Sequence, residues 1–131
     1  MQRGVFLTQI RPLPIAKYRL YYCIETRIFV KKKWSVEMTK EAEKRLRTDF
    51  NSGQITDIDI KVIKRWIADI EDQGLEFTQH KADWRDHQLV GEWKGHRSIS
   101  FSFSGRVIYK AENEKVIVRV VRVTASHDYK K

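Results

Sequence analysis

The sequence predicts an α+β fold in which two helices pack on one face of an antiparallel-rich sheet, with the element order β-α-α-β-β-β. Three patterns predict it: one short alternating run, two segments with helical apolar spacing, and three further alternating runs. The chain has 131 residues and is 41% hydrophobic, which is enough for a core but leaves little for a second domain. We therefore expect one compact domain.

The first strand and the first helix are predicted close together. Residues 34–38 alternate apolar and polar side chains, the pattern of a half-buried strand. Thr39 follows as a predicted N-cap, and acidic residues in the next turn suit the positive end of the helix dipole. We expect this helix to reach about Phe50 and to end in the turn Asn51-Ser52-Gly53.

A second helix is predicted directly after this turn. Thr56 and Asp59 form a capping box in which Asp replaces the usual Glu. Four isoleucines follow at helical spacing: Ile60, Ile63, Ile67 and Ile70. Gly74 ends the helix, so the two helices are expected to form an αα-hairpin. A polar segment follows, from Glu76 to Gly91.

The last third of the chain predicts three strands, over residues 93–103, 106–111 and 116–124. Ser104-Gly105 marks the first turn and Glu112-Asn113-Glu114 marks the second. Two short turns in succession indicate an antiparallel meander.

The positive charge lies at the two ends of the chain. Lys and Arg total 26 and Asp and Glu total 17, for a formal charge of +9. Residues 1–32 have seven basic and one acidic side chain, residues 33–86 have ten and twelve, and residues 87–131 have nine and four. We interpret 1–32 as a basic N-terminal extension and 33–131 as the domain. The excess suits a polyanionic partner such as nucleic acid.

Several classes of site are excluded by what the sequence lacks. Cys23 is the single cysteine, which excludes an intrachain disulfide and favours a reducing cytoplasm. No apolar run approaches the ~20 residues of a membrane span, so no membrane partner is expected. The histidines lack metal-site spacing and the acids are not clustered on the strands, so neither a metal nor another cofactor is expected.

Basic side chains and histidines accumulate on the three predicted C-terminal strands. They are Lys94, His96, Arg97, Arg106, Lys110, Arg119, Arg122 and His127. We expect Arg97 and Arg106 to share one face of the sheet. Such a basic face suits phosphates, although an ordinary solvated sheet face would have a similar composition. Metal-free RNA cleavage needs a base, an acid and cations around the phosphate. His87 and His127 are candidates for the two proton-transfer roles because histidine titrates near neutral pH.

Three segments carry a family resemblance that covers residues 33–131. Asp86-His87-Gln88-Leu89, with the following Gly91 to Arg97, resembles the DHxLxGxWKGxR stretch of the RelE/YafQ superfamily of bacterial type II toxins. Gly105 to Lys110 resembles that superfamily's IYK-type strand. Ser126-His127-Asp128-Tyr129 resembles the terminal SHxxY element of HigB-like members.

The resemblance implies an endoribonuclease that cleaves mRNA in the ribosomal A site, in the cytoplasm, and that a cognate antitoxin inhibits within a hetero-oligomer. It implies catalytic roles for His127 and His87 and phosphate contacts for Arg97 and Arg106. Tyr129 matches a terminal aromatic that stacks on or orients the substrate base. Further RNA contacts are expected from four residues: Lys94, His96, Lys110 and Arg122.

The sequence departs from the YafQ-like pattern at two places on the strands. Ser100 stands where that pattern has a histidine, and Ser104-Gly105 stands where it has Asp-Trp. The departures leave open which side chain is the general base. Two alternative functions also stay open: a ParE-like gyrase inhibitor of the same fold without hydrolytic activity, and a non-catalytic nucleic-acid-binding module.

Overall fold

A computed structural model describes residues 33–126 of the chain. All of them belong to the predicted domain. The expectations for the extension, 1–32, and for His127 and Tyr129 lie outside the described residues.

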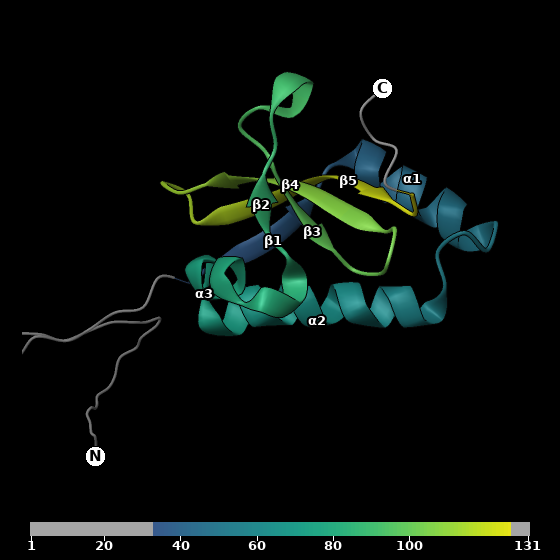
Figure 1. The fold of residues 1–131 in the computed structure, drawn as a ribbon, viewed down its shortest axis with the longest axis horizontal. Helices are drawn as coiled ribbons and strands as arrows, with labels where there is room; N and C mark the ends of the chain where they lie inside the picture. Colours follow the sequence, from purple (N-terminus) through teal and green to yellow (C-terminus); the bar gives the residue numbers. More distant parts are fainter. Residues whose placement is uncertain (1–32, 127–131) are drawn as a thin grey trace, which may run out of the picture. The chain divides into compact units, whose positions relative to one another are not determined.

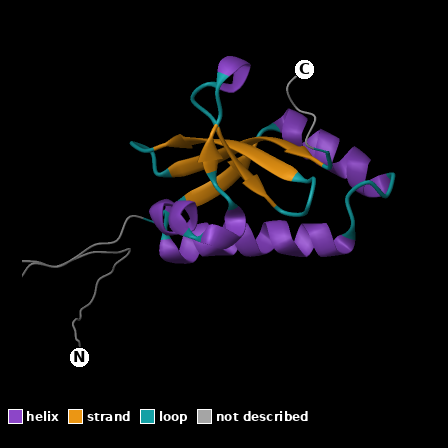
Figure 2. Ribbon diagram, viewed as in Figure 1, coloured by secondary structure: helices purple, strands orange, loops and turns teal. Residues whose placement is uncertain are grey.

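Within residues 33–126 five strands form one mixed sheet (Figures 1 and 2). They are β1 (Ser35–Met38), β2 (His87–Gln88), β3 (Arg97–Ser100), β4 (Arg106–Glu112) and β5 (Ile117–Thr124). Their order in space is β1-β5-β4-β3-β2, with β1 parallel to β5 and every other pair antiparallel. The predicted α+β fold and the meander β3-β4-β5 are confirmed.

The two long helices begin where their caps were predicted. In α1 (Lys40–Asn51) the Thr39 side chain accepts a hydrogen bond from the Ala42 N–H at 3.1 Å. In α2 (Asp57–Gln73) Thr56 and Asp59 make both hydrogen bonds of the capping box, at 3.0 and 3.2 Å. The helix α1 packs against β5, whereas α2 packs against β1 and the next helix.

A third helix, α3 (Leu75–His80), stands where the sequence predicted only a polar segment. Its six residues are too few to show helical periodicity, but Leu75 and Thr78 are buried. Gly74, with φ of 94°, separates it from α2. The short helical turns η1 (Ala82–Trp84) and η2 (Gly91–Trp93) follow. The strand that was predicted over residues 93–103 is therefore much shorter, because η2 and Gly95, at φ of 91°, occupy its first part.

The core lies between the sheet and the helices. Its fully buried side chains include Trp66 and Ile70 of α2, Ile99 of β3, and Val118 and Val120 of β5. We call this side of the sheet the inner face. The opposite side is the outer face, and η2 projects from the sheet on the side away from α2 (Figure 2).

Candidate functional site

Two rows of side chains cross the outer face of the sheet. In the first row His87, Ser98, Ile108 and Arg122 are register partners on β2, β3, β4 and β5. In the second row Ser100, Arg106 and Thr124 are partners on β3, β4 and β5. From strand spacing, the Cα atoms of His87 and Arg106 are about 12 Å apart, so both side chains can reach one phosphodiester.

Arg106 extends over the loop that joins β3 to β4. Its Nη1 donates to the carbonyl oxygens of Gly105 at 2.9 Å, Phe103 at 3.2 Å and Ser102 at 3.4 Å. Among the described residues no carboxylate forms an ion pair with Arg106. Its positive charge is therefore available to an anion on the outer face.

His87 is exposed at the edge of the sheet on β2. Its Nδ1 lies 2.9 Å from the carbonyl oxygen of Arg85. This contact engages Nδ1 and leaves Nε2, on the opposite side of the ring, for a substrate. Arg85 itself has φ of 52°, a left-handed conformation that is uncommon for a residue other than glycine. The turn at Arg85 thus orients both the histidine ring and the arginine.

The expectation that Arg97 and Arg106 share one face of the sheet is wrong. Arg97 pairs in register with Tyr109 and alternates with Ser98, so it lies on the inner face with Ile99. Its Nε donates to the buried Asp86 carboxylate at 2.5 Å. Its guanidinium is thereby held inside the domain, and its contact with phosphate stays a prediction.

Asp86 is the centre of a buried polar cluster at this edge of the sheet. Its side chain is fully buried and accepts hydrogen bonds from Arg97 and, at 2.6 Å, from the Tyr109 hydroxyl. Gln79 of α3 donates to the Tyr109 oxygen at 3.3 Å. Burial, reinforced by the Asp86 charge, raises the pKa of Tyr109 far above its usual value. The cluster ties α3, β3 and β4 to the residue before His87.

Of the other predicted RNA-contacting residues, two pack against an aromatic ring and two are exposed. Arg122 lies over the Trp93 ring at 5.5 Å, and His96 packs edge-on against the same ring at 5.4 Å. Trp93 thus covers part of the outer face beside Arg122. Lys94 and Lys110 are exposed.

Arg119 also lies on the outer face, but acidic residues neutralise it. It contacts Glu112 at 2.8 Å and Glu37 at 3.3 Å, and the hydrogen bond from Arg119 lowers the pKa of Glu112. Arg119 is therefore less available to an anion than Arg106, which has no acidic partner among the described residues.

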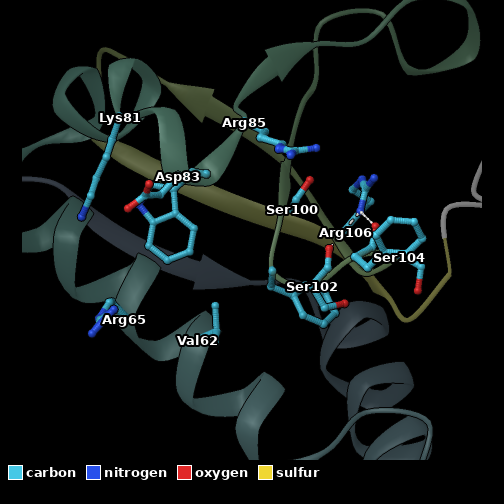
Figure 3. A pocket seen from close by; sticks show the side chains of 12 residues that line it. Val62, Arg65, Lys81, Asp83, Arg85, Ser100, Ser102, Ser104 and Arg106 are labelled. Atoms are coloured by element: carbon cyan, nitrogen blue, oxygen red, sulfur yellow. Dashed lines mark hydrogen bonds between the residues drawn. The ribbon is translucent and has the colours of Figure 1, made fainter.

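A depression of about 610 Å³ opens beside this end of the sheet (Figure 3). β2 is too short to cover β3 at Ser100, and α2, η1 and the β3–β4 loop form the walls. Basic side chains and serines dominate its polar lining, with one acid: Arg65, Lys81, Arg85, Arg106, Ser100, Ser102, Ser104 and Asp83. We call it the edge depression.

Arg65 and Arg85 are lining residues that the sequence did not single out. Arg85 directly precedes the Asp86-His87 pair, which is the signal that could have drawn attention to it. Arg65 belongs to a helix whose polar face has the ordinary composition of a solvated surface. Only the packing of α2 beside β3 brings it to the depression.

Solved structures of bacterial toxins share this architecture. The E. coli DinJ–YafQ toxin–antitoxin complex matches with a TM-score of 0.56 and 21% identity, over 73% of this chain and 94% of the other. A metal-bound toxin from Helicobacter pylori matches with a TM-score of 0.58 and 18% identity, over 75% of this chain and 99% of the other. The chain has a RelE/YafQ-type toxin fold. A chain of the YoeB–YefM complex from Staphylococcus aureus has the same fold. It matches with a TM-score of 0.52 and 12% identity, over 71% of this chain and 97% of the other.

The chain resembles these toxins in structure only, since no protein-family model and no curated protein matches its sequence. Within the described part of the chain, no group of three His, Cys, Asp or Glu side chains could hold a metal ion. No helix of that part is long and apolar enough to cross a membrane.

Proposed function

We propose that this chain is the toxin of a type II toxin–antitoxin system and a metal-independent endoribonuclease. In this proposal it cleaves mRNA in the ribosomal A site, in the cytoplasm, and so stops translation. The observation that carries the proposal is the outer face, where His87, Arg106 and Arg122 lie together on a sheet of the RelE/YafQ type. The motifs around His87 and His127 support it independently of the fold.

The proposed reaction is attack of an RNA 2′-hydroxyl on the adjacent phosphate. One histidine accepts the hydroxyl proton and the other protonates the leaving 5′-oxygen; His127 takes one role and His87 the other. Arg106 stabilises the charge that develops on the phosphorane. Ala125 lies next to the β3–β4 loop that Arg106 contacts, because Ser104 Oγ donates to the Ala125 carbonyl at 2.9 Å.

The remaining residues have binding or positioning roles in the proposal. Lys94, Lys110 and Arg122 contact the flanking RNA backbone, and His96 supports this surface through Trp93. Tyr129 orients the substrate base. Arg97 acts as a positioning residue: through Asp86 it fixes the start of β2, and with it His87.

The proposed partner is a cognate antitoxin in a hetero-oligomer. DinJ–YafQ and YoeB–YefM are solved as toxin–antitoxin complexes with the same toxin fold. A basic outer face can be neutralised by an acidic or amphipathic segment that covers it. The face around Arg106 is the surface that we expect such a segment to cover.

Mapping the cleavage ends of a reporter mRNA in a translating extract tests the proposal. We expect the wild type to cut within codons on ribosomes, and His127→Ala to slow cutting by about 10²–10⁴-fold. His80→Ala is the matched control, because His80 is an exposed histidine on α3 that contacts the Glu76 carbonyl.

Equal cutting by wild type and His127→Ala would contradict the assigned catalytic role. Intact mRNA together with DNA damage and cell filamentation would contradict the ribonuclease and favour gyrase binding. Salt-sensitive RNA binding without cleavage would favour a non-catalytic module.

A further inference from the structure

We propose that the edge depression binds one nucleotide of single-stranded RNA, with Phe103 stacking on its base and Arg85 and Arg106 holding its phosphate. The inference rests on the proposed ribonuclease function, which supplies RNA as the ligand. It adds a binding site for a nucleotide that flanks the cleaved bond, and it assigns roles to Phe103 and Arg85.

Phe103 is the most exposed large apolar side chain in the described chain. Its side chain is 100% exposed, at the loop between β3 and β4, although it belongs to the residue types that gain most from burial. The ring lines the edge depression together with basic side chains. Aromatic rings next to cations are the usual platform for single-stranded nucleic acid, because bases stack on the ring while cations contact the backbone.

The loop that carries Phe103 is held firmly at both ends. Phe101 is buried in the core, and its N–H donates to the Gly105 carbonyl at 3.1 Å. The Gly105 N–H donates to Ser102 Oγ at 2.9 Å, and a Cβ at Gly105 would lie only 2.5 Å from Phe101 Cε1. Together with the three carbonyls bound by Arg106, these contacts fix the backbone that carries Phe103, so less loop entropy is lost on binding.

Two arginines supply the phosphate contact. Figure 3 shows Arg85 and Arg106 on the same side of the depression, on either side of Ser100. Neither forms an ion pair with a described carboxylate. Lys81 is different, because it contacts Asp69 at 3.2 Å and lies over the Trp84 ring. Arg85 and Arg106 can therefore bind an oxyanion without first breaking an internal pair.

The size and openness of the depression suit a nucleotide that enters from a continuous strand. Its volume of about 610 Å³ falls within the ~300–1,000 Å³ of ordinary ligand sites. The serines at positions 100, 102 and 104 add hydroxyl groups that can contact a ribose or a phosphate. An apolar protein segment would find one exposed ring among mostly charged neighbours, so the lining favours RNA over a protein partner.

Binding of the full-length protein to two strands of equal charge tests the inference. Both are 2′-O-methylated, which blocks cleavage, and both have about eight nucleotides. One is oligouridine and the other has the same backbone without bases. Fluorescence anisotropy gives the affinity of each, for the wild type and for Phe103→Ala, Phe103→Trp and Arg85→Gln. Phe77→Ala is the matched control, since Phe77 is an exposed phenylalanine on α3 away from the edge depression.

We expect Phe103→Ala to weaken binding of oligouridine by about ten-fold and to leave the abasic strand unaffected, because only the stack is lost. Phe103→Trp keeps the wild-type affinity. Arg85→Gln weakens the binding of both strands. It also lowers the magnitude of the slope of log affinity against log salt by about 0.7, the change for one phosphate contact on a single strand. Phe77→Ala changes neither affinity.

Unchanged oligouridine affinity in Phe103→Ala would overturn the inference, as would an equal loss for both strands. Loss of antitoxin binding with unchanged RNA binding would show that Phe103 docks a protein instead. The cleavage assay reports separately on the proposed function: a wild type that binds bases through Phe103 but does not cut mRNA defeats the ribonuclease and supports the nucleotide site.

Discussion

The two faces of the sheet use the same residue type for different purposes. Arg97 on the inner face and Arg106 on the outer face belong to adjacent antiparallel strands. Arg97 is bound to a fully buried carboxylate, whereas Arg106 contacts only carbonyl oxygens of its own loop and forms no ion pair within residues 33–126. Removing one partner of a buried ion pair leaves an uncompensated charge inside the fold, whereas a charge without an internal partner is available to a ligand.

Replacing Arg106 should produce the largest effect, and on activity alone. We expect Arg106→Ala to slow mRNA cleavage by about 10²–10³-fold, because a cation beside the reacting phosphate is lost. Its free energy of unfolding should fall by less than about 1 kcal/mol, since water can replace its contacts with the loop. Single-turnover cleavage and urea unfolding measure the two quantities. A stability loss as large as that of Arg97→Ala would break the contrast between the faces.

Replacing Arg97 should have the opposite profile. Arg97→Ala leaves the Asp86 carboxylate buried without its cation, and we expect a loss of about 3 kcal/mol in the free energy of unfolding. The double variant with Asp86→Asn should lose less than the sum of the two single variants, because the unpaired charge is gone. Full stability of Arg97→Ala combined with slow cleavage would instead support the phosphate contact that the family resemblance implies.

Tyr109→Phe gives the smallest effect and adds a pH dependence. At neutral pH we expect the free energy of unfolding to fall by about 1 kcal/mol, because the hydrogen bond from the Tyr109 hydroxyl to Asp86 is lost. The raised pKa of Tyr109 in the folded state means that, above pH ~10, the unfolded chain loses this proton before the folded one. The wild type therefore loses stability there, and its advantage over Tyr109→Phe should shrink as the pH rises. Urea unfolding of both proteins between pH 7 and 11 measures it, and a constant difference would contradict the buried position of the hydroxyl.

Local signals explain which parts of the fold could be predicted. The caps at Thr39 and Thr56 depend on neighbouring residues, and both helix starts were predicted correctly. The helix α3 was missed because its burial depends on contacts with α2. The parallel pairing of β1 with β5 joins segments about 80 residues apart, and no local pattern encodes such a pairing.

The candidate site was predictable as a set of residues but not as a surface. The motif that begins at Asp86 identifies His87, but which face Arg97 and Arg106 occupy depends on the register between β3 and β4, which pairs Arg97 with Tyr109 and Arg106 with Ser100. On β5 an irregularity leaves Val121 without a partner, so that Val120 and Val123 both face the core. The positive φ of Arg85 likewise has no signal in the sequence. The assignments of His127 and Tyr129 stay predictions from the family resemblance.

The order of the strands determines when the domain can fold during its synthesis. β5 is the last of the described strands to be synthesised, yet it lies between β1 and β4 and supplies Val118, Val120 and Val123 to the core. A nascent chain without it has no partner for β1 and only an incomplete apolar layer, so it cannot form the sheet. Under the proposed function, an RNA-cutting surface therefore assembles only after β5 has left the exit tunnel. A ribosome is thus not exposed to this surface while it is still synthesising the chain up to β5.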